Sequence, residues 1–157
     1  MTCEAVDPSR HKGQQIILVA IASLAALPGV IALARGLPPL PVFLLGGALV
    51  LMAFLVSREA GQIARYGLSA ALMGVLMCIT AALSGHPWQL DSHMLYFAGL
   101  AGLIVLIDAR ALMLAVALVA AQHVLLGAFL PSLIYPASDL LTNLARAGVH
   151  GAILTAE

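Results

Sequence analysis

The sequence predicts an all-α membrane protein, a polytopic bundle of six transmembrane helices with both the N-terminus and the C-terminus in the cytoplasm. Apolar residues make up 62% of the chain and charged residues only 9%, against about 25% charged residues in a typical soluble domain. The charges divide the 157 residues into uncharged runs, each close to the length of about 20 residues that crosses a bilayer. These runs do not alternate apolar and polar residues, as the strands of a transmembrane β-barrel would.

Charges and prolines bound the first three predicted helices. The run 13–34 carries no charge and ends before an arginine, and a proline followed by glycine inside it, at Pro28, predicts a kink. The run 36–57 opens with turn-forming prolines and ends before the charged pair that starts at Arg58. The third run covers about 66–84.

Turn and capping residues separate the last three predicted helices. Glycine, proline and aspartate mark 85–91 as a loop, after which the fourth helix covers about 92–107. A very short connection follows, in which we expect Asp108 to form a local ion pair with the arginine two residues later. The fifth helix covers 111–130 and stops at a proline. A serine or aspartate then caps the sixth helix, which continues from about 139 to the last residue.

The positions of lysine and arginine give the orientation, because short cytoplasmic loops carry an excess of these residues. With the N-terminus inside, the outer loops hold only Arg35. The inner segments then hold five basic residues, which are Arg10, Lys12, Arg58, Arg65 and Arg110. We therefore expect residues 1–14 to form a cytoplasmic tail and residues 15–157 to form one six-helix transmembrane domain.

A group of polar residues in the second half of the chain is unusual for a membrane protein. Ionisable side chains inside a bilayer are costly, and they usually face the bundle interior or a water-filled cavity. Four of the five histidines, one aspartate and one arginine lie toward the outer half of the bundle or near its midplane, and a tryptophan stands at the outer rim. We therefore predict a pocket for a ligand or cofactor, built by His86, Trp88, Asp91, His93, His123, Arg146 and His150.

Three kinds of site fit these residues. The first is a transition metal such as copper or zinc, which suits imidazole with carboxylate. Its candidate ligands are His86, Asp91, His93, His123 and His150. The second is haem b, held by His123 and His150 at similar depth on facing helices. The third is a pocket without a cofactor, in which Arg146 holds an anionic group or the histidines respond to protons.

Each of these residues also has a purely structural interpretation. A single intramembrane histidine such as His123 often makes a hydrogen bond between helices. His86 then becomes a solvated loop residue, and Arg146 reaches the lipid headgroups through its long side chain. The functional interpretation depends on the joint occurrence of so many polar groups toward one end of an otherwise apolar bundle.

Other functional classes match the sequence less well. The formal net charge is zero and no basic stripe exists, so we expect no binding to nucleic acid. We expect no enzyme either, because no nucleophile–base pair, P-loop or dinucleotide fingerprint is present. A transporter is compatible with six helices, but the two halves show no matching broken helices. A small haem- or metal-bearing redox membrane protein is the main alternative to a protein that binds a ligand in this pocket without a cofactor.

Four short motifs follow one another in the second half of the chain. They are 86–94 with 96–101, Asp108-Ala109-Arg110, 122–126 with Pro131, and Arg146-x-x-x-His150 with Glu157. In this order they resemble the N-terminal six-helix membrane sensor domain of bacterial methyl-accepting chemotaxis proteins, over about residues 85–157. Two positions depart from that family, because Gln122 replaces one histidine of a pair and Ala109 replaces an aromatic residue.

The resemblance implies a signal-input module for signal transduction, located in the bacterial inner (cytoplasmic) membrane. It also implies a homodimer and a cytoplasmic signalling domain downstream of residue 157. The chain ends inside a predicted helix with no glycine stop and no basic flank, so we expect it to stop short of such an output domain. The resemblance does not identify the ligand.

Overall fold

The computed structural model of the chain describes residues 8–59, 61–133, 141, 145, 148–149 and 152. The regular elements of this part are helices, which confirms the all-α prediction. In chain order they are α1 (Pro8–Leu24), α2 (Leu27–Ala34), α3 (Leu40–Val56), α4 (Gln62–Ala82), α5 (Gln89–Ser92), α6 (Met94–Leu103), η1 (Ile104–Leu106), α7 (Ala109–Phe129) and η2 (Pro131–Leu133). Of the predicted sixth helix, residues 141, 145, 148–149 and 152 are described and are helical, whereas Arg146 and His150 lie outside the described residues.

Four stretches of the described chain are long and apolar enough to cross a membrane, which identifies a membrane protein. They are Pro8–Ala34, Gln62–Ala82, Gln89–Leu106 and Ala109–Phe129. The second predicted span corresponds to α3, which has 17 residues. At 1.5 Å per residue α3 is about 26 Å long, at the lower limit for a hydrocarbon core of about 30 Å.

The first predicted span is interrupted, as the Pro28-Gly29 pair predicts. α1 ends at Leu24 and α2 begins at Leu27, because a proline lacks the N–H that would bond to the carbonyl four residues earlier. A Cβ atom added to Gly29 would lie 2.5 Å from the ring of Phe43. The glycine therefore allows α3 to pack closely against the first turn of α2.

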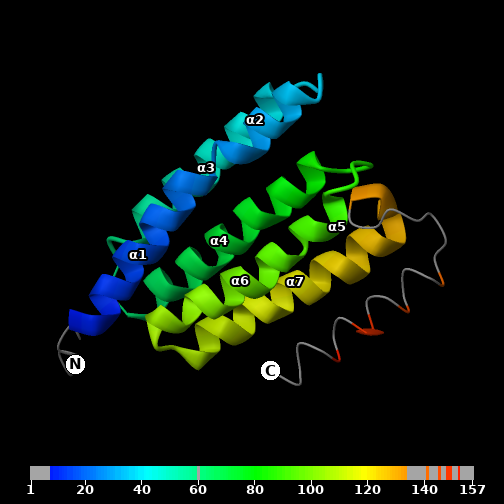
Figure 1. Cartoon of the computed structure of the whole chain (residues 1–157). Helices are drawn as coiled ribbons and strands as arrows, with labels where there is room; N and C mark the ends of the chain where they lie inside the picture. The colour runs from blue at the N-terminus through cyan, green and yellow to red at the C-terminus, as the bar shows by residue number, and fades with distance from the viewer. Residues whose placement is uncertain are drawn as a thin grey trace.

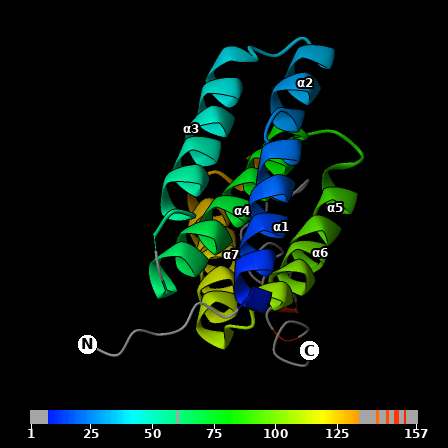
Figure 2. The ribbon, with the colours of Figure 1, turned by 90° about the vertical axis from the view of Figure 1, so that its left-hand side faces the viewer.

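Helix α4 forms the centre of the bundle and packs against α1, α2, α3, α6 and α7 (Figures 1 and 2). Within its candidate span 61% of the residues are buried, against 28% for the span in α7. Leu68, Met73 and Ile79 of α4 are almost completely buried in the core. The outer helices instead expose large apolar side chains, as lipid contact requires. On α3 these include Leu40, Phe43, Leu44, Leu45, Leu51 and Leu55.

The helices alternate in direction, so the bundle has two ends with different chemistry (Figure 1). We call the end formed by residues 35–39, 83–93 and 130–133 the groove end. We call the end formed by residues 8–13, 57–59 and 61–65, together with the turn between α6 and α7 at 104–110, the Asp108 end. The residues predicted to bind a ligand lie at or near the groove end, as far as the structure describes them.

Candidate functional site

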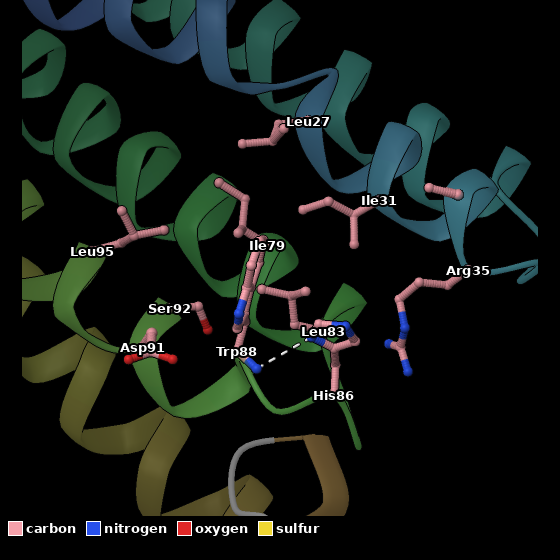
Figure 3. Close-up of a pocket in the computed structure, with 11 residues that line it drawn as sticks. Leu27, Ile31, Arg35, Ile79, Leu83, His86, Trp88, Asp91, Ser92 and Leu95 are labelled. Carbon is pink, nitrogen blue, oxygen red and sulfur yellow. Dashed lines mark hydrogen bonds between the residues drawn. The ribbon is translucent and has the colours of Figure 1, made fainter.

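A cavity of about 600 Å³ opens at the groove end, between α2, the last turns of α4 and the segment from the α4–α5 loop to α6 (Figure 3). Its apolar lining consists of Leu27, Ile31, Ala34, Ile79, Leu83 and Leu95. Arg35, His86, Trp88, Asp91 and Ser92 also border the cavity, although the surface that lines it is almost entirely apolar. Three of the predicted binding residues, His86, Trp88 and Asp91, therefore share one cavity, which we call the groove.

Arg35 is a residue of the groove that the sequence analysis counted only as a loop charge. Its Nη1 donates to the carbonyl of Ala82 at 2.6 Å, and its Nη2 donates to the carbonyl of Ser84 at 2.8 Å. The Ala82 carbonyl ends α4 and the Ser84 carbonyl follows two residues later, at the end of the helix where the dipole favours a cation. Arg35 therefore fastens the end of α2 to the end of α4 and fixes a positive charge beside the groove.

His86 points a hydrogen-bond donor outward from its loop. The backbone N–H of Trp88 donates to Nδ1 of His86 at 3.2 Å (Figure 3). Since Nδ1 accepts this bond, the hydrogen of the neutral imidazole lies on Nε2. The indole of Trp88 also meets the imidazole edge-on, with ring centroids 5.7 Å apart. The loop thus holds His86 in one orientation with Nε2–H available as a donor.

The short helix α5 is fixed to its surroundings by Gln89, which is 1% exposed. Its Nε2 donates to the carbonyl of Ser132 at 3.0 Å, and its Oε1 accepts the N–H of Gly85 at 3.0 Å. The backbone carbonyl of Gln89 accepts twice, from Oγ of Ser92 at 2.7 Å and from Nδ1 of His93 at 2.9 Å. One carbonyl therefore joins a residue of the groove wall, Ser92, to the buried His93.

Behind α5, His93 meets Tyr96 and His123, and we call these three residues the imidazole–tyrosine cluster. The ring centroids lie 5.6 Å apart for the two histidines, 5.8 Å for His93 and Tyr96, and 5.7 Å for Tyr96 and His123. All three side chains are buried, and Nε2 of Gln122 donates to the hydroxyl of Tyr96 at 3.2 Å. The cluster brings α6 and α7 together with mutually edge-on rings.

Both histidines of the cluster have the same tautomer. Nδ1 of His93 bonds to the Gln89 carbonyl, and Nδ1 of His123 bonds to the Val119 carbonyl at 2.8 Å. A carbonyl can only accept, so the hydrogen lies on Nδ1 and the lone pair of the neutral ring lies on Nε2. Histidines that bind metals are commonly oriented in this way by a backbone carbonyl. The tautomer is therefore opposite to that of His86 and suits a ligand histidine.

The predicted binding residues fall into two groups rather than one. His86, Trp88 and Asp91 line the groove, whereas His93 and His123 belong to the cluster behind α5. Within the residues that the structure describes, no three His, Cys, Asp or Glu side chains come together as a metal site requires. The described part of the proposed metal ligand set therefore does not form a metal site by itself.

The haem prediction pairs His123 with His150, and His150 lies outside the described residues. His123 is instead in contact with His93, at a centroid separation of 5.6 Å. Two imidazoles on opposite sides of an iron need ring centroids about 6 Å apart or more, since each metal–nitrogen bond is about 2 Å long. The described pair would have to separate to hold a haem iron between them.

The Asp108 end contains an ion pair that the sequence analysis missed. Oδ2 of Asp108 accepts from Nε of Arg65 at 2.5 Å, and the two side chains are only 9% and 7% exposed. Oδ1 accepts the N–H groups of Arg110 at 3.0 Å and Ala111 at 3.2 Å, which caps α7. The predicted local pair with Arg110 is therefore wrong, because the capping carboxylate turns back onto the backbone and meets the guanidinium from α4.

The pKa of Asp108 reflects these contacts. Burial of the carboxyl raises its pKa, but the hydrogen bond from Arg65 and those from the backbone of Ala111 and Arg110 lower it by more, so the net pKa lies below the ordinary value of 3.8. The residue before it, Ile107, has a φ of 50°, which is rare for a β-branched side chain. The turn between α6 and α7 thus combines a strained residue with a charged contact to α4.

Comparison of the chain with protein-family models, with curated proteins and with solved structures gives no match. The resemblance to the sensor domain of chemotaxis receptors therefore stays a prediction. At one of the two positions that depart from that family, Gln122 donates a hydrogen bond to the hydroxyl of Tyr96, beside His123.

Proposed function

We propose that the chain is a transmembrane sensory module that binds a signal at the groove end and passes a change in helix packing to the Asp108 end. The single observation that carries this proposal is the backbone carbonyl of Gln89, which accepts from both Ser92 and His93. A ligand that displaces the groove wall would thereby disturb the imidazole–tyrosine cluster. The proposal requires no catalytic residue.

The orientation in the proposal follows from the distribution of basic residues. Within the described chain, Arg10, Lys12, Arg58, Arg65 and Arg110 all lie at the Asp108 end, and Arg35 lies at the groove end. The positive-inside rule then places the Asp108 end in the cytoplasm and the groove end outside. We infer a multi-pass protein of the bacterial inner membrane that acts as a homodimer and controls a cytoplasmic signalling domain following residue 157.

The path from the cluster to the cytoplasmic end runs along α6 and α7. His93 and Tyr96 stand at the start of α6 and His123 near the end of α7, and the same two helices meet at the Asp108 turn. That turn contains the strained Ile107 and the Arg65 contact to α4. A ligand can shift the equilibrium between two packings of these helices only by the difference in its affinity for the two.

Backbone hydrogen–deuterium exchange of the purified protein in lipid nanodiscs tests this coupling without knowledge of the ligand. His93→Phe keeps a ring but removes the bond to Gln89, and Ser92→Ala removes the other one. Each should change the exchange rate of residues 104–110 by about threefold or more. Ser23→Ala is the matched control, because Ser23 also donates to a backbone carbonyl, that of Val19, but does so within α1. Altered exchange that stays confined to residues 86–96 would contradict the proposal.

The second candidate is a haem- or metal-bearing redox membrane protein. One observation favours it, namely the shared tautomer of His93 and His123, which places both Nε2 lone pairs in a ligand-like state. An absorption spectrum and a metal analysis of the purified protein decide the question. A Soret band that disappears in His123→Ala, or stoichiometric copper or zinc, would establish this alternative. A colourless and metal-free preparation would leave the cofactor-free sensor.

A further inference from the structure

We propose that the groove binds a single-chain amphiphile with an anionic head, of the fatty-acid class, as the signal that the module senses. This inference rests on the proposed function and adds the chemical class of its ligand. It follows from three features of the groove, which are its aliphatic walls, the donors gathered at one side, and its size.

The walls of the groove suit a hydrocarbon chain. Leu27 and Ile31 face it from α2, Ile79 from α4, Leu83 from the position directly after α4, and Leu95 from α6 (Figure 3). These side chains offer no hydrogen bond to a polar ligand body, whereas each methylene that they bury strengthens binding about fourfold. The chemistry of the walls therefore selects an extended apolar group.

The donors of the groove suit an anionic head. Arg35 has five N–H donors, of which the carbonyls of Ala82 and Ser84 engage Nη1 and Nη2, so the guanidinium keeps donors and its full charge for a ligand. His86 adds Nε2–H, because its Nδ1 accepts from the backbone. Both residues line the groove on the same side in the view of Figure 3, with the Asp91 carboxylate on the other side. A carboxylate is attracted to the side of Arg35 and repelled from that of Asp91.

The size and position of the groove favour one chain over two. A cavity of about 600 Å³ is typical of a small-molecule site, for which volumes of roughly 300–1,000 Å³ are usual. Arg35 directly follows α2, at the membrane interface in the proposed orientation. A fatty acid would place its carboxylate at the level of Arg35 and its chain between α2 and α4.

Trp88 provides a direct probe, because it lines the groove and is the only tryptophan of the chain. We expect dibromostearic acid to quench the Trp88 fluorescence of the protein in nanodiscs in a saturable way, and unlabelled stearic acid to reverse the quenching. Arg35→Gln should weaken this binding about tenfold or more, since it removes a charged hydrogen-bond donor. Ala34→Phe should weaken it as well by filling the groove, without touching the contacts of Arg35.

Three controls make the result decisive. Arg58→Gln removes a charge at the opposite end and should leave the binding unchanged. Dibromostearyl alcohol has the same chain without the charge, and equal saturable quenching by it would overturn the anionic head. Equal quenching by a brominated phosphatidylcholine would overturn the single chain, and quenching that neither saturates nor reverses would overturn the site.

The same samples separate this inference from the proposed function. If dibromostearic acid binds but leaves the exchange of residues 104–110 unchanged, the groove ligand is supported and the sensory coupling fails. If dibromostearic acid does not bind, while His93→Phe and Ser92→Ala still alter that exchange, the ligand class fails and the coupling is supported.

Discussion

At the scale of single residues, the carboxylate of Asp108 makes two kinds of contact. One oxygen caps α7 and the other accepts from Arg65 of α4. Removing one partner of a mostly buried ion pair leaves the other charge without compensation, which is more costly than the net stabilisation that the pair provides. Asp108 thereby links the N-terminus of α7 to the central helix α4.

We predict that Asp108→Asn, which keeps a capping side chain but loses the charge, destabilises the protein by about 1–3 kcal/mol at neutral pH. The lowered pKa of Asp108 means that its charge stabilises the folded state above the ordinary pKa of 3.8, and that this stability is lost as the pH falls through the lower folded-state pKa. Thermal unfolding in detergent should thus show a constant difference between wild type and variant above about pH 5 that shrinks below about pH 4.

A matched control for this prediction is Arg110→Ala. Arg110 contributes only its backbone N–H to the Asp108 carboxylate, and its side chain is exposed, so its removal should leave the melting temperature nearly unchanged. If Arg110→Ala lowered the melting temperature more than Asp108→Asn, the result would support the local ion pair between Asp108 and Arg110 that the sequence suggested.

At the scale of helices, glycines such as Gly13, Gly46 and Gly99 set the distance between neighbours. A Cβ atom on Gly13 of α1 would lie 2.1 Å from the carbonyl oxygen of Val105, and one on Gly46 of α3 would lie 2.4 Å from that of Ala25. Gly99 of α6 similarly faces the side chain of Leu76. Small residues at such positions let membrane helices approach closely when the lipid supplies no hydrophobic driving force between them.

We predict that Gly13→Ala destabilises the bundle by about 1–3 kcal/mol, because the obstructing atom belongs to the backbone and cannot rotate away. Gly102→Ala is the control, since a Cβ there meets nothing within 4 Å. Alanine suits a helix interior better than glycine, so this control should be neutral or stabilising by about 0.5–1 kcal/mol. Comparable losses of melting temperature in both variants would show that the contact with Val105 does not limit the packing.

At the scale of the whole molecule, the two ends of the bundle differ in charge and in shape. The described basic side chains are concentrated at the Asp108 end, and the groove lies at the other. The arrangement places an open site on one side of the membrane and a tightly paired turn on the other. The central helix α4 contacts the elements of both ends, through Ala82 and through Arg65.

Cysteine labelling in intact cells tests the orientation. In a variant without the native cysteines, Leu37→Cys at the groove end should react with a membrane-impermeant maleimide. Glu59→Cys at the Asp108 end should react only after permeabilisation, because the positive-inside rule places that end in the cytoplasm. Both positions are exposed, so accessibility alone does not separate them. The reverse labelling pattern would invert the orientation and move the groove to the cytoplasm.

Much of the fold could be predicted from the sequence, because hydropathy and turn residues act locally. The uncharged runs and the break at Pro28 occur where the sequence places them. The cap at Asp108 and the short helix α5, which begins inside the expected loop 85–91, were not predicted. Glycines close together on one helix differ in their surroundings, since Gly46 and Gly99 face a neighbour while Gly47 and Gly102 face open space. Helical spacing alone does not say which side of a helix a neighbour will cover.

The candidate site shows the same limit. The described binding residues lie toward one end of an apolar bundle, which could be predicted because it depends only on position along each helix. Helix packing instead sets the division of these residues, in which His86 and Asp91 line a groove while His93 and His123 meet behind it. It also decided the contacts of Arg35 and Arg65, each of which reaches a partner more than 40 positions away. The reason is physical, since such partners are chosen by how helices cross and rotate, and no local pattern contains that information.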